Sequence, residues 1–102
     1  MNPAISEVTR RIAEAFVPVK IIVFGSQATG RPEKNSDLDL LIIYDGPLTK
    51  REIKLGIREL FPHPKISMDL FVLNSDEYAR QSRIPTTIGR TAALEGVAAS
   101  HD

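Results

Sequence analysis

The stretch that decides the fold is VKIIVFGSQATGRPEKNSDLDLLIIY, residues 19–44. Residues 19–24 are a short run of β-branched and aromatic side chains, which predicts a largely buried strand. Gly25-Ser26 interrupts this run, and a polar, proline-containing loop follows. Residues 37–44 begin with alternating carboxylates and continue as an apolar run, which predicts a second strand. The stretch is therefore interpreted as strand, glycine-serine turn, loop and strand.

Helices are predicted on both sides of this stretch. Asn2-Pro3 is typical of a helix start, because proline lacks the N–H that the first turn leaves unpaired, and Pro18 stops this helix. Thr49 and Glu52 have the spacing of a capping box, in which the two residues satisfy each other's free N–H groups. They predict a second helix that ends before Pro62.

The remainder of the chain predicts one more strand and two more helices. The strand covers residues 66–73, and Asn74 or Ser75 then caps a short helix. Pro85 opens a last helix, and Gly96 is typical of a helix C-terminus. We therefore expect a small α/β domain in residues 1–98, with helices packed on a mixed sheet of three or four strands, and a flexible tail in residues 99–102. A flavodoxin-like fragment is the competing interpretation, but it would normally need more βα units.

The composition argues against several classes of function. Thirteen Lys and Arg balance thirteen Asp and Glu, whereas nonspecific binding to nucleic acid or anionic membranes needs a basic excess. No apolar run approaches the roughly 20 residues of a membrane helix. Because the chain has no cysteine, disulfides, thiolate metal sites and a cysteine nucleophile are excluded. No signal-peptide pattern is visible, so we expect a cytoplasmic protein.

The residues that carry chemistry are the carboxylates that open the second strand and the turn that closes the first. Asp37 and Asp39 point to the same face of a strand because side chains alternate. Two neighbouring carboxylates repel each other and call for a cation between them, and Mg²⁺ is bound by a few carboxylates together with phosphate oxygens and waters. Gly25 permits close approach of the backbone, and Ser26 offers hydroxyl and N–H donors to an anion. Together they predict a site for a nucleotide with Mg²⁺.

A third carboxylate, Asp69, lies inside the otherwise apolar third strand. If that strand neighbours the second, Asp69 joins the same cluster, and three acids are enough to hold two metal ions about 3.5–4 Å apart. Asp69 would then lie near the attacking hydroxyl and accept its proton. Two ordinary interpretations stay open: an Asp-x-Asp at a strand start is often a solvated turn, and Asp69 can be a charged residue that protects an exposed sheet edge.

The pattern resembles the minimal nucleotidyltransferase domains of the DNA polymerase β-like superfamily. Their signature is Gly-Ser, about ten residues, Asp-x-Asp and a later strand aspartate, and here it falls on Gly25, Ser26, Asp37, Asp39 and Asp69. The similarity spans almost the whole chain and implies a palm-like fold. One departure is Thr29, where relatives often carry an arginine, so Arg31 or Lys34 is the candidate for a triphosphate contact.

The resemblance also implies an activity and a partner. It implies Mg²⁺-dependent transfer of AMP from ATP to a hydroxyl, with Asp37, Asp39 and Asp69 as metal-binding and catalytic residues and with Gly25 and Ser26 at the phosphates. Stand-alone domains of this size resemble antitoxins that pair with HEPN-type RNase toxins and modify a toxin tyrosine. Two alternatives stay open: an antitoxin that acts by binding alone, and a homodimeric enzyme that modifies a small molecule.

The small size of the chain supports a partner. A domain of 102 residues leaves little sequence for a separate acceptor-binding lobe, so we expect another molecule to supply part of the acceptor site in a homo- or hetero-oligomer. We expect neither direct nucleic-acid binding nor membrane contact.

Overall fold

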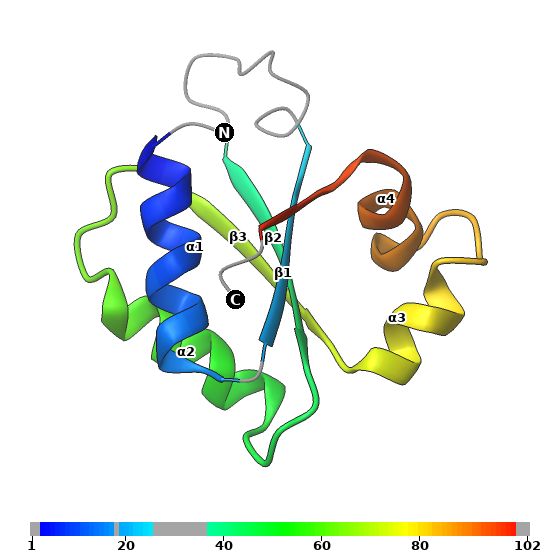
Figure 1. Cartoon of the computed structure of the whole chain (residues 1–102), viewed down its shortest axis with the longest axis horizontal. Coiled ribbons are helices and arrows are strands. Elements are labelled where there is room, and N and C mark those ends of the chain that lie inside the picture. The colour runs from blue at the N-terminus through cyan, green and yellow to red at the C-terminus, as the bar shows by residue number, and fades with distance from the viewer. Residues whose placement is uncertain (1–2, 18, 26–36, 100–102) are drawn as a thin grey trace.

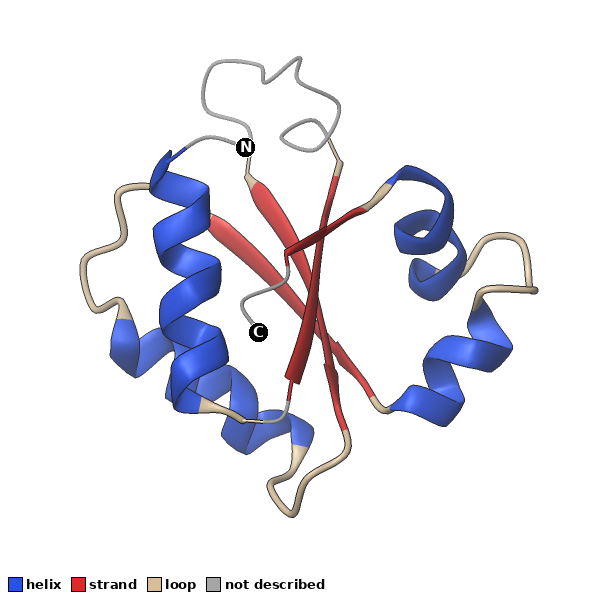
Figure 2. Ribbon diagram, in the orientation of Figure 1, coloured by secondary structure: helices blue, strands red, loops and turns tan. Residues whose placement is uncertain are grey.

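A four-stranded mixed sheet forms the centre of the computed structural model, which describes residues 3–17, 19–25 and 37–99 (Figures 1 and 2). The strands are β1 (Val19–Phe24), β2 (Leu38–Tyr44), β3 (Met68–Leu73) and β4 (Val97–Ala99), in the spatial order β3-β2-β1-β4. β1 runs antiparallel to β2 and β4, whereas β2 and β3 are parallel. The predicted α/β class and mixed sheet are confirmed.

Helices cover both faces of this sheet (Figure 2). Their bounds are α1 (Pro3–Ala15), α2 (Lys50–Leu60), α3 (Ser75–Gln81) and α4 (Ile88–Glu95). α1 and α2 lie on one face, and α3 and α4 lie on the other (Figure 1). Both faces of β2 are therefore buried, which explains its continuous apolar run.

Alternation along β2 divides its side chains between two hydrophobic cores. Leu40 and Ile42 belong to the larger core under α1 and α2. Leu41 and Ile43 belong to the smaller core under α3 and α4. Odd-numbered positions of β2 therefore face α3 and α4, and this parity decides on which side of the sheet the acidic residues of β2 lie.

Two helices begin at complete capping boxes. The Thr49 side chain accepts a hydrogen bond from the backbone N–H of Glu52 at 3.1 Å, and the Glu52 carboxylate accepts one from the Thr49 N–H at 2.9 Å, as the sequence predicts. Asn74 and Glu77 make the same reciprocal pair at the start of α3. These contacts satisfy donors that a helix start leaves unpaired.

The predicted last helix begins later than expected. Thr87, not Pro85, is the cap of α4, because the Thr87 side chain accepts from the N–H of Arg90 and because Thr86 has a φ of 73° that no helix accommodates. β3 likewise begins at Met68 rather than at residue 66.

β4 has no counterpart among the predicted elements. It follows Gly96, which ends α4 as predicted but with a φ of −79°, so the residue is not there for a left-handed turn. A Cβ at this position would overlap the Ile22 side chain of β1 and the Ala92 carbonyl. The glycine therefore lets the chain turn tightly from α4 onto the edge of β1. β4 reaches Ala99, the first residue of the expected tail, and residues 100–102 lie outside the described part.

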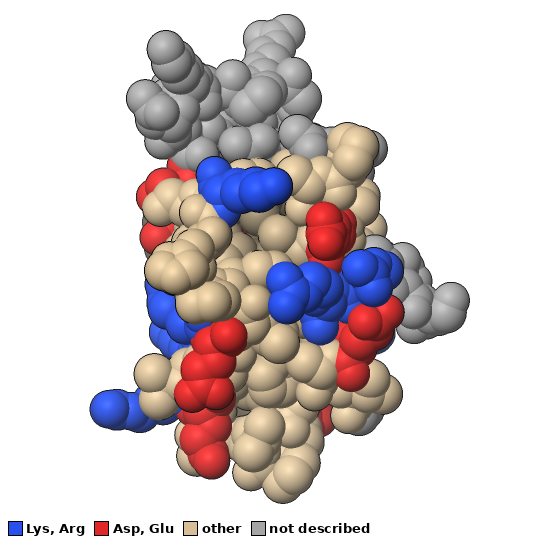
Figure 3. All heavy atoms as spheres, turned by 90° about the vertical axis from the view of Figure 1, so that its left-hand side faces the viewer, with Lys and Arg blue, Asp and Glu red and all other residues tan. Residues whose placement is uncertain are grey.

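None of the helices in the described ranges is long and apolar enough to cross a membrane. The α1/α2 side of the surface carries basic and acidic side chains in alternation rather than one continuous patch of either sign (Figure 3).

Candidate active site

Three strand ends meet at one end of the sheet. β1 finishes there at Phe24, and β2 and β3 both begin there. The register places Asp39 opposite Phe24 on one side and opposite Asp69 on the other. Asp39 is therefore the middle position of a row that crosses three strands, and Gly25 directly follows Phe24, the β1 member of that row.

Asp39 and Asp69 lie on the same face of the sheet, the face that α3 and α4 cover further along. Asp39 is half-buried, whereas Asp69 on the edge strand is exposed. The prediction that the third strand pairs with the second and brings Asp69 to the first two acids is confirmed for this pair. Asp37 directly precedes β2 and is exposed.

Burial and neighbouring negative charges disfavour ionisation of Asp39. Partial burial raises the pKa of Asp39 above its ordinary value of 3.8, and the negative charges of Asp69 and Asp37 raise it further. A side-chain hydrogen bond with Asp69 acts in the same direction. Asp39 therefore keeps its proton to a higher pH than an isolated aspartate does.

No described lysine or arginine neutralises these carboxylates by an ion pair. The ion pairs within residues 3–17, 19–25 and 37–99 join Arg10 to Glu14 and Lys50 to Glu77. Carboxylates that are close together and lack a basic partner are suited to a hard divalent cation, which favours oxygen ligands.

Gly25 lies directly against Asp39. Its φ is 78°, a left-handed conformation that residues with a Cβ rarely adopt. A Cβ built on Gly25 would overlap the Oδ2 atom of Asp39 and come within 3.3 Å of its Cγ. Glycine is therefore required here for two reasons: the turn, and the room taken by the carboxylate.

Several residues singled out in the sequence lie outside the described part of the chain. They are Ser26 of the turn, Thr29, and the two candidate triphosphate contacts Arg31 and Lys34.

The described residues supply only some of the ligands that a metal ion needs. Within the described ranges, no three His, Asp or Glu side chains are grouped closely enough to hold a metal ion. Two paired carboxylates with a third nearby instead fit an ion such as Mg²⁺, which commonly takes one or two carboxylates and completes its shell with waters and substrate phosphates.

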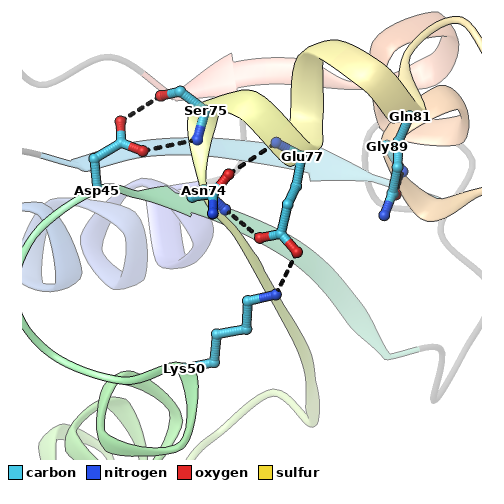
Figure 4. Close-up of polar contacts among 7 residues, drawn as sticks. All are labelled: Asp45, Lys50, Asn74, Ser75, Glu77, Gln81 and Gly89. Atoms are coloured by element: carbon cyan, nitrogen blue, oxygen red, sulfur yellow. Dashed lines mark hydrogen bonds and ion pairs between the residues drawn. The ribbon is translucent and has the colours of Figure 1, made fainter.

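The opposite end of the sheet has a different character. A cavity of about 350 Å³ lies there, among the ends of β2 and β3 and the starts of α2 and α3. Its surroundings are held by a 2.7 Å ion pair between Lys50 and Glu77 and by hydrogen bonds from Ser75 to Asp45 (Figure 4). Neither this cavity nor a second one of about 240 Å³ beside α1 includes the paired acids.

An aromatic pair beside the acids was missed in the sequence. Phe71 follows Asp69 by two residues, so its ring lies on the same face. Its ring centroid is 5.7 Å from that of Phe24, with the planes tilted by 47°. The signal was available as the alternation of Asp69 and Phe71, but their relation to Phe24 depends on strand order.

Comparison with known proteins identifies the family and the fold. A family profile described as "Nucleotidyltransferase domain" matches residues 5–88. No curated protein matches the chain.

Two solved structures share the fold. The first is described as a toxin-antitoxin with AMP-PNP; the similarity has a TM-score of 0.66 at 16% identity, over 95% of this chain and 73% of that one. The second is a mutant of the toxin-antitoxin MntA-HpeT in which two aspartates two positions apart are replaced by glutamate. It has a TM-score of 0.61 at 16% identity, over 100% of this chain and 75% of that one.

Proposed function

Because this chain belongs to the nucleotidyltransferase domain family, we propose that it transfers AMP from ATP to a hydroxyl group of a partner protein. The observation that carries the proposal is the pairing of Asp39 with Asp69 in register, beside Gly25 and without a basic partner among the described residues. Asp39 has a raised pKa, and groups with a shifted pKa are frequent at functional sites.

Asp37, Asp39 and Asp69 are the proposed ligands of Mg²⁺, with two ions as the working number. When bound, Mg²⁺ supplies positive charge that stabilises the phosphoryl-transfer transition state. Asp69, at the exposed end of the row, holds the acceptor hydroxyl and takes its proton. Gly25 and Ser26 bind the β- and γ-phosphates through backbone and hydroxyl donors, which orients the α-phosphorus for in-line attack.

The proposed biological role is that of an antitoxin. The two solved structures reported above are described as toxin-antitoxin proteins, and one of them was obtained with AMP-PNP. We propose that the partner is a HEPN-type RNase toxin and that the acceptor is a toxin tyrosine. We further propose that another chain of a hetero-oligomer supplies this acceptor to the domain in residues 1–98.

Transfer of label from [α-³²P]ATP to the co-purified partner tests the proposal. The wild type with Mg²⁺ is expected to label the partner, and Asp39→Asn is expected to abolish labelling while the protein stays folded. Asp76→Asn is the matched control, because Asp76 is an exposed aspartate beside the cavity at the far end of the sheet. Equal labelling by the wild type and Asp39→Asn would reject the metal-binding role.

A second function is favoured by one observation: the described residues contain no preformed three-ligand metal group. The protein would then neutralise its toxin by binding alone, with an inactive acidic site. Cells that express the toxin together with an Asp37→Asn/Asp39→Asn double variant separate the two functions. Full protection means that binding suffices, and loss of protection by a folded, toxin-binding variant means that transfer is needed.

A further inference from the structure

The strand order indicates on which side of Asp39 each of the two substrates of the proposed reaction lies. On the β1 side, Asp39 lies opposite Phe24, which Gly25 follows directly. On the β3 side, Asp39 lies opposite Asp69. β3 is an edge strand of the sheet, with β2 as its only strand neighbour among the described residues. If the phosphates are held at Gly25 and the proton acceptor is Asp69, the acceptor reaches the row from the open β3 edge.

Phe71 is the next side chain on that edge and on that face. It follows Asp69 along β3 and lies opposite Leu41, one step further from the end of the sheet. Its ring is half-buried, whereas Phe24 is only 5% exposed. The Phe71 ring contacts Phe24, and Phe71 keeps part of its surface exposed two residues from the exposed Asp69, on the same face of the sheet.

A fixed, partly exposed ring beside a carboxylate suits an acceptor that is itself aromatic. Aromatic rings pair in tilted or offset arrangements with centroids about 4.5–7 Å apart. Two residues along a strand, such as Asp69 and Phe71, are about 6.6 Å apart. A phenol that packs its ring against Phe71 can therefore place its hydroxyl group near the carboxylate of Asp69. An aliphatic hydroxyl would reach Asp69 but leave Phe71 uncovered.

We propose that Phe71 is a specificity-determining residue that packs against the acceptor ring, so that the site prefers a phenolic to an aliphatic hydroxyl. The inference rests on the proposed function and adds the residue that selects the acceptor. In the step itself, the phenolic oxygen forms a bond to the α-phosphorus of ATP. The bond from that phosphorus to the bridging oxygen of the β-phosphate breaks, pyrophosphate leaves, and Asp69 takes the phenolic proton.

Two small acceptors test the preference directly: N-acetyltyrosinamide and N-acetylserinamide, each at millimolar concentration with [α-³²P]ATP and Mg²⁺. The wild type is expected to label the tyrosine compound with the higher kcat/KM. Phe71→Leu is expected to raise the KM for the tyrosine compound about tenfold, the size of a lost aromatic contact, and to leave the serine compound and the KM for ATP unchanged. Phe71→Tyr keeps a ring and is expected to retain the preference.

Tyr78→Leu is the matched control, because Tyr78 is a half-buried aromatic residue that packs on the same core from α3. It is expected to leave the ratio between the two acceptors unchanged, and circular dichroism checks that all variants are folded.

Four results would overturn the inference. A wild type without preference, or a Phe71→Leu variant that loses both acceptors equally, removes the specificity role. A variant that raises the KM for ATP alone places the ring at the nucleobase. If the wild type labels neither compound nor its partner protein, the proposed function fails and takes the inference with it.

Discussion

Replacing Gly25 with alanine perturbs the contact on which the site depends. The backbone at this position has a φ of 78°, and an L-residue in the left-handed region costs about 1–2 kcal/mol. The new Cβ would also overlap the Oδ2 atom of Asp39, so the carboxylate has to leave its place opposite Asp69. The overlap adds to the conformational cost, so we expect a total above about 2 kcal/mol.

The assay is thermal unfolding followed by circular dichroism at 222 nm. A domain of about 100 residues changes its Tm by roughly 4–8 °C per kcal/mol, so Gly25→Ala is expected to lower the Tm by about 8 °C or more. The same substitution in an Asp39→Ala background isolates the contact, because the overlapping carboxylate is gone and only the conformational cost remains.

The two backgrounds therefore give different losses if the contact exists, with a coupling of about 0.5–3 kcal/mol, as is usual for residues in contact. Equal losses in both backgrounds would refute the close approach of Asp39 to Gly25. No loss in either would refute the left-handed backbone.

Three further predictions concern stability. Because the pKa of Asp39 is raised, ionisation of this group destabilises the folded state, and stability is lost as the pH rises through the folded-state pKa. Asp39→Asn is therefore expected to have a higher Tm than the metal-free wild type at pH 7, and this difference is expected to disappear at about pH 3. A lower Tm of the variant at pH 7 would contradict the prediction. Thr49→Ala removes the acceptor for the Glu52 N–H and is expected to cost about 0.5–2 kcal/mol in urea unfolding, whereas an unchanged midpoint would mean that the cap is dispensable. Hydrogen bonds from Ser75 lower the pKa of Asp45, so the stabilisation by these bonds is present above about pH 4 and disappears as the pH falls through the folded-state pKa. Asp45→Asn is expected to unfold more easily than the wild type at pH 7 but not at low pH. A difference that persists unchanged at acid pH would show that ionisation of Asp45 is not its cause.

Local signals in the sequence were sufficient for most elements. The bounds of β1 agree with the predicted residues 19–24, because a run of β-branched residues lies between Pro18 and Gly25. The Thr49–Glu52 capping box fixes the start of α2 in the same local way. Helix caps and short buried strands depend on neighbouring residues and are therefore visible in the sequence.

The errors occur where distant residues decide. β4 is three residues long and exists because it pairs with β1, which no local pattern reveals. In the sequence 85–88, proline and two threonines all suit a helix start, and only the backbone at Thr86 shows that α4 begins after them. Tertiary context overrides local preference in both cases.

The same contrast between local signals and distant contacts applies to the candidate site. The alternation of Asp37 and Asp39 is a local pattern and predicts that both lie on one face. Which residue neighbours Asp39 depends on the strand order. The sequence therefore predicts that Asp69 joins the acidic cluster only if the third strand pairs with the second. The aromatic pair of Phe24 and Phe71 joins two strands that are not adjacent in the sheet, and it could not be inferred before that order was established.

The most direct measurement is calorimetric titration of AMP-PNP into the protein with Mg²⁺ and, separately, with EDTA. The wild type is expected to bind the analogue only when Mg²⁺ is present, Asp39→Asn and Asp69→Asn are expected to lose this Mg²⁺-dependent binding, and Asp76→Asn is expected to keep it. Binding that is equally strong in EDTA, or unchanged in Asp39→Asn, would contradict a metal-nucleotide site at the paired carboxylates.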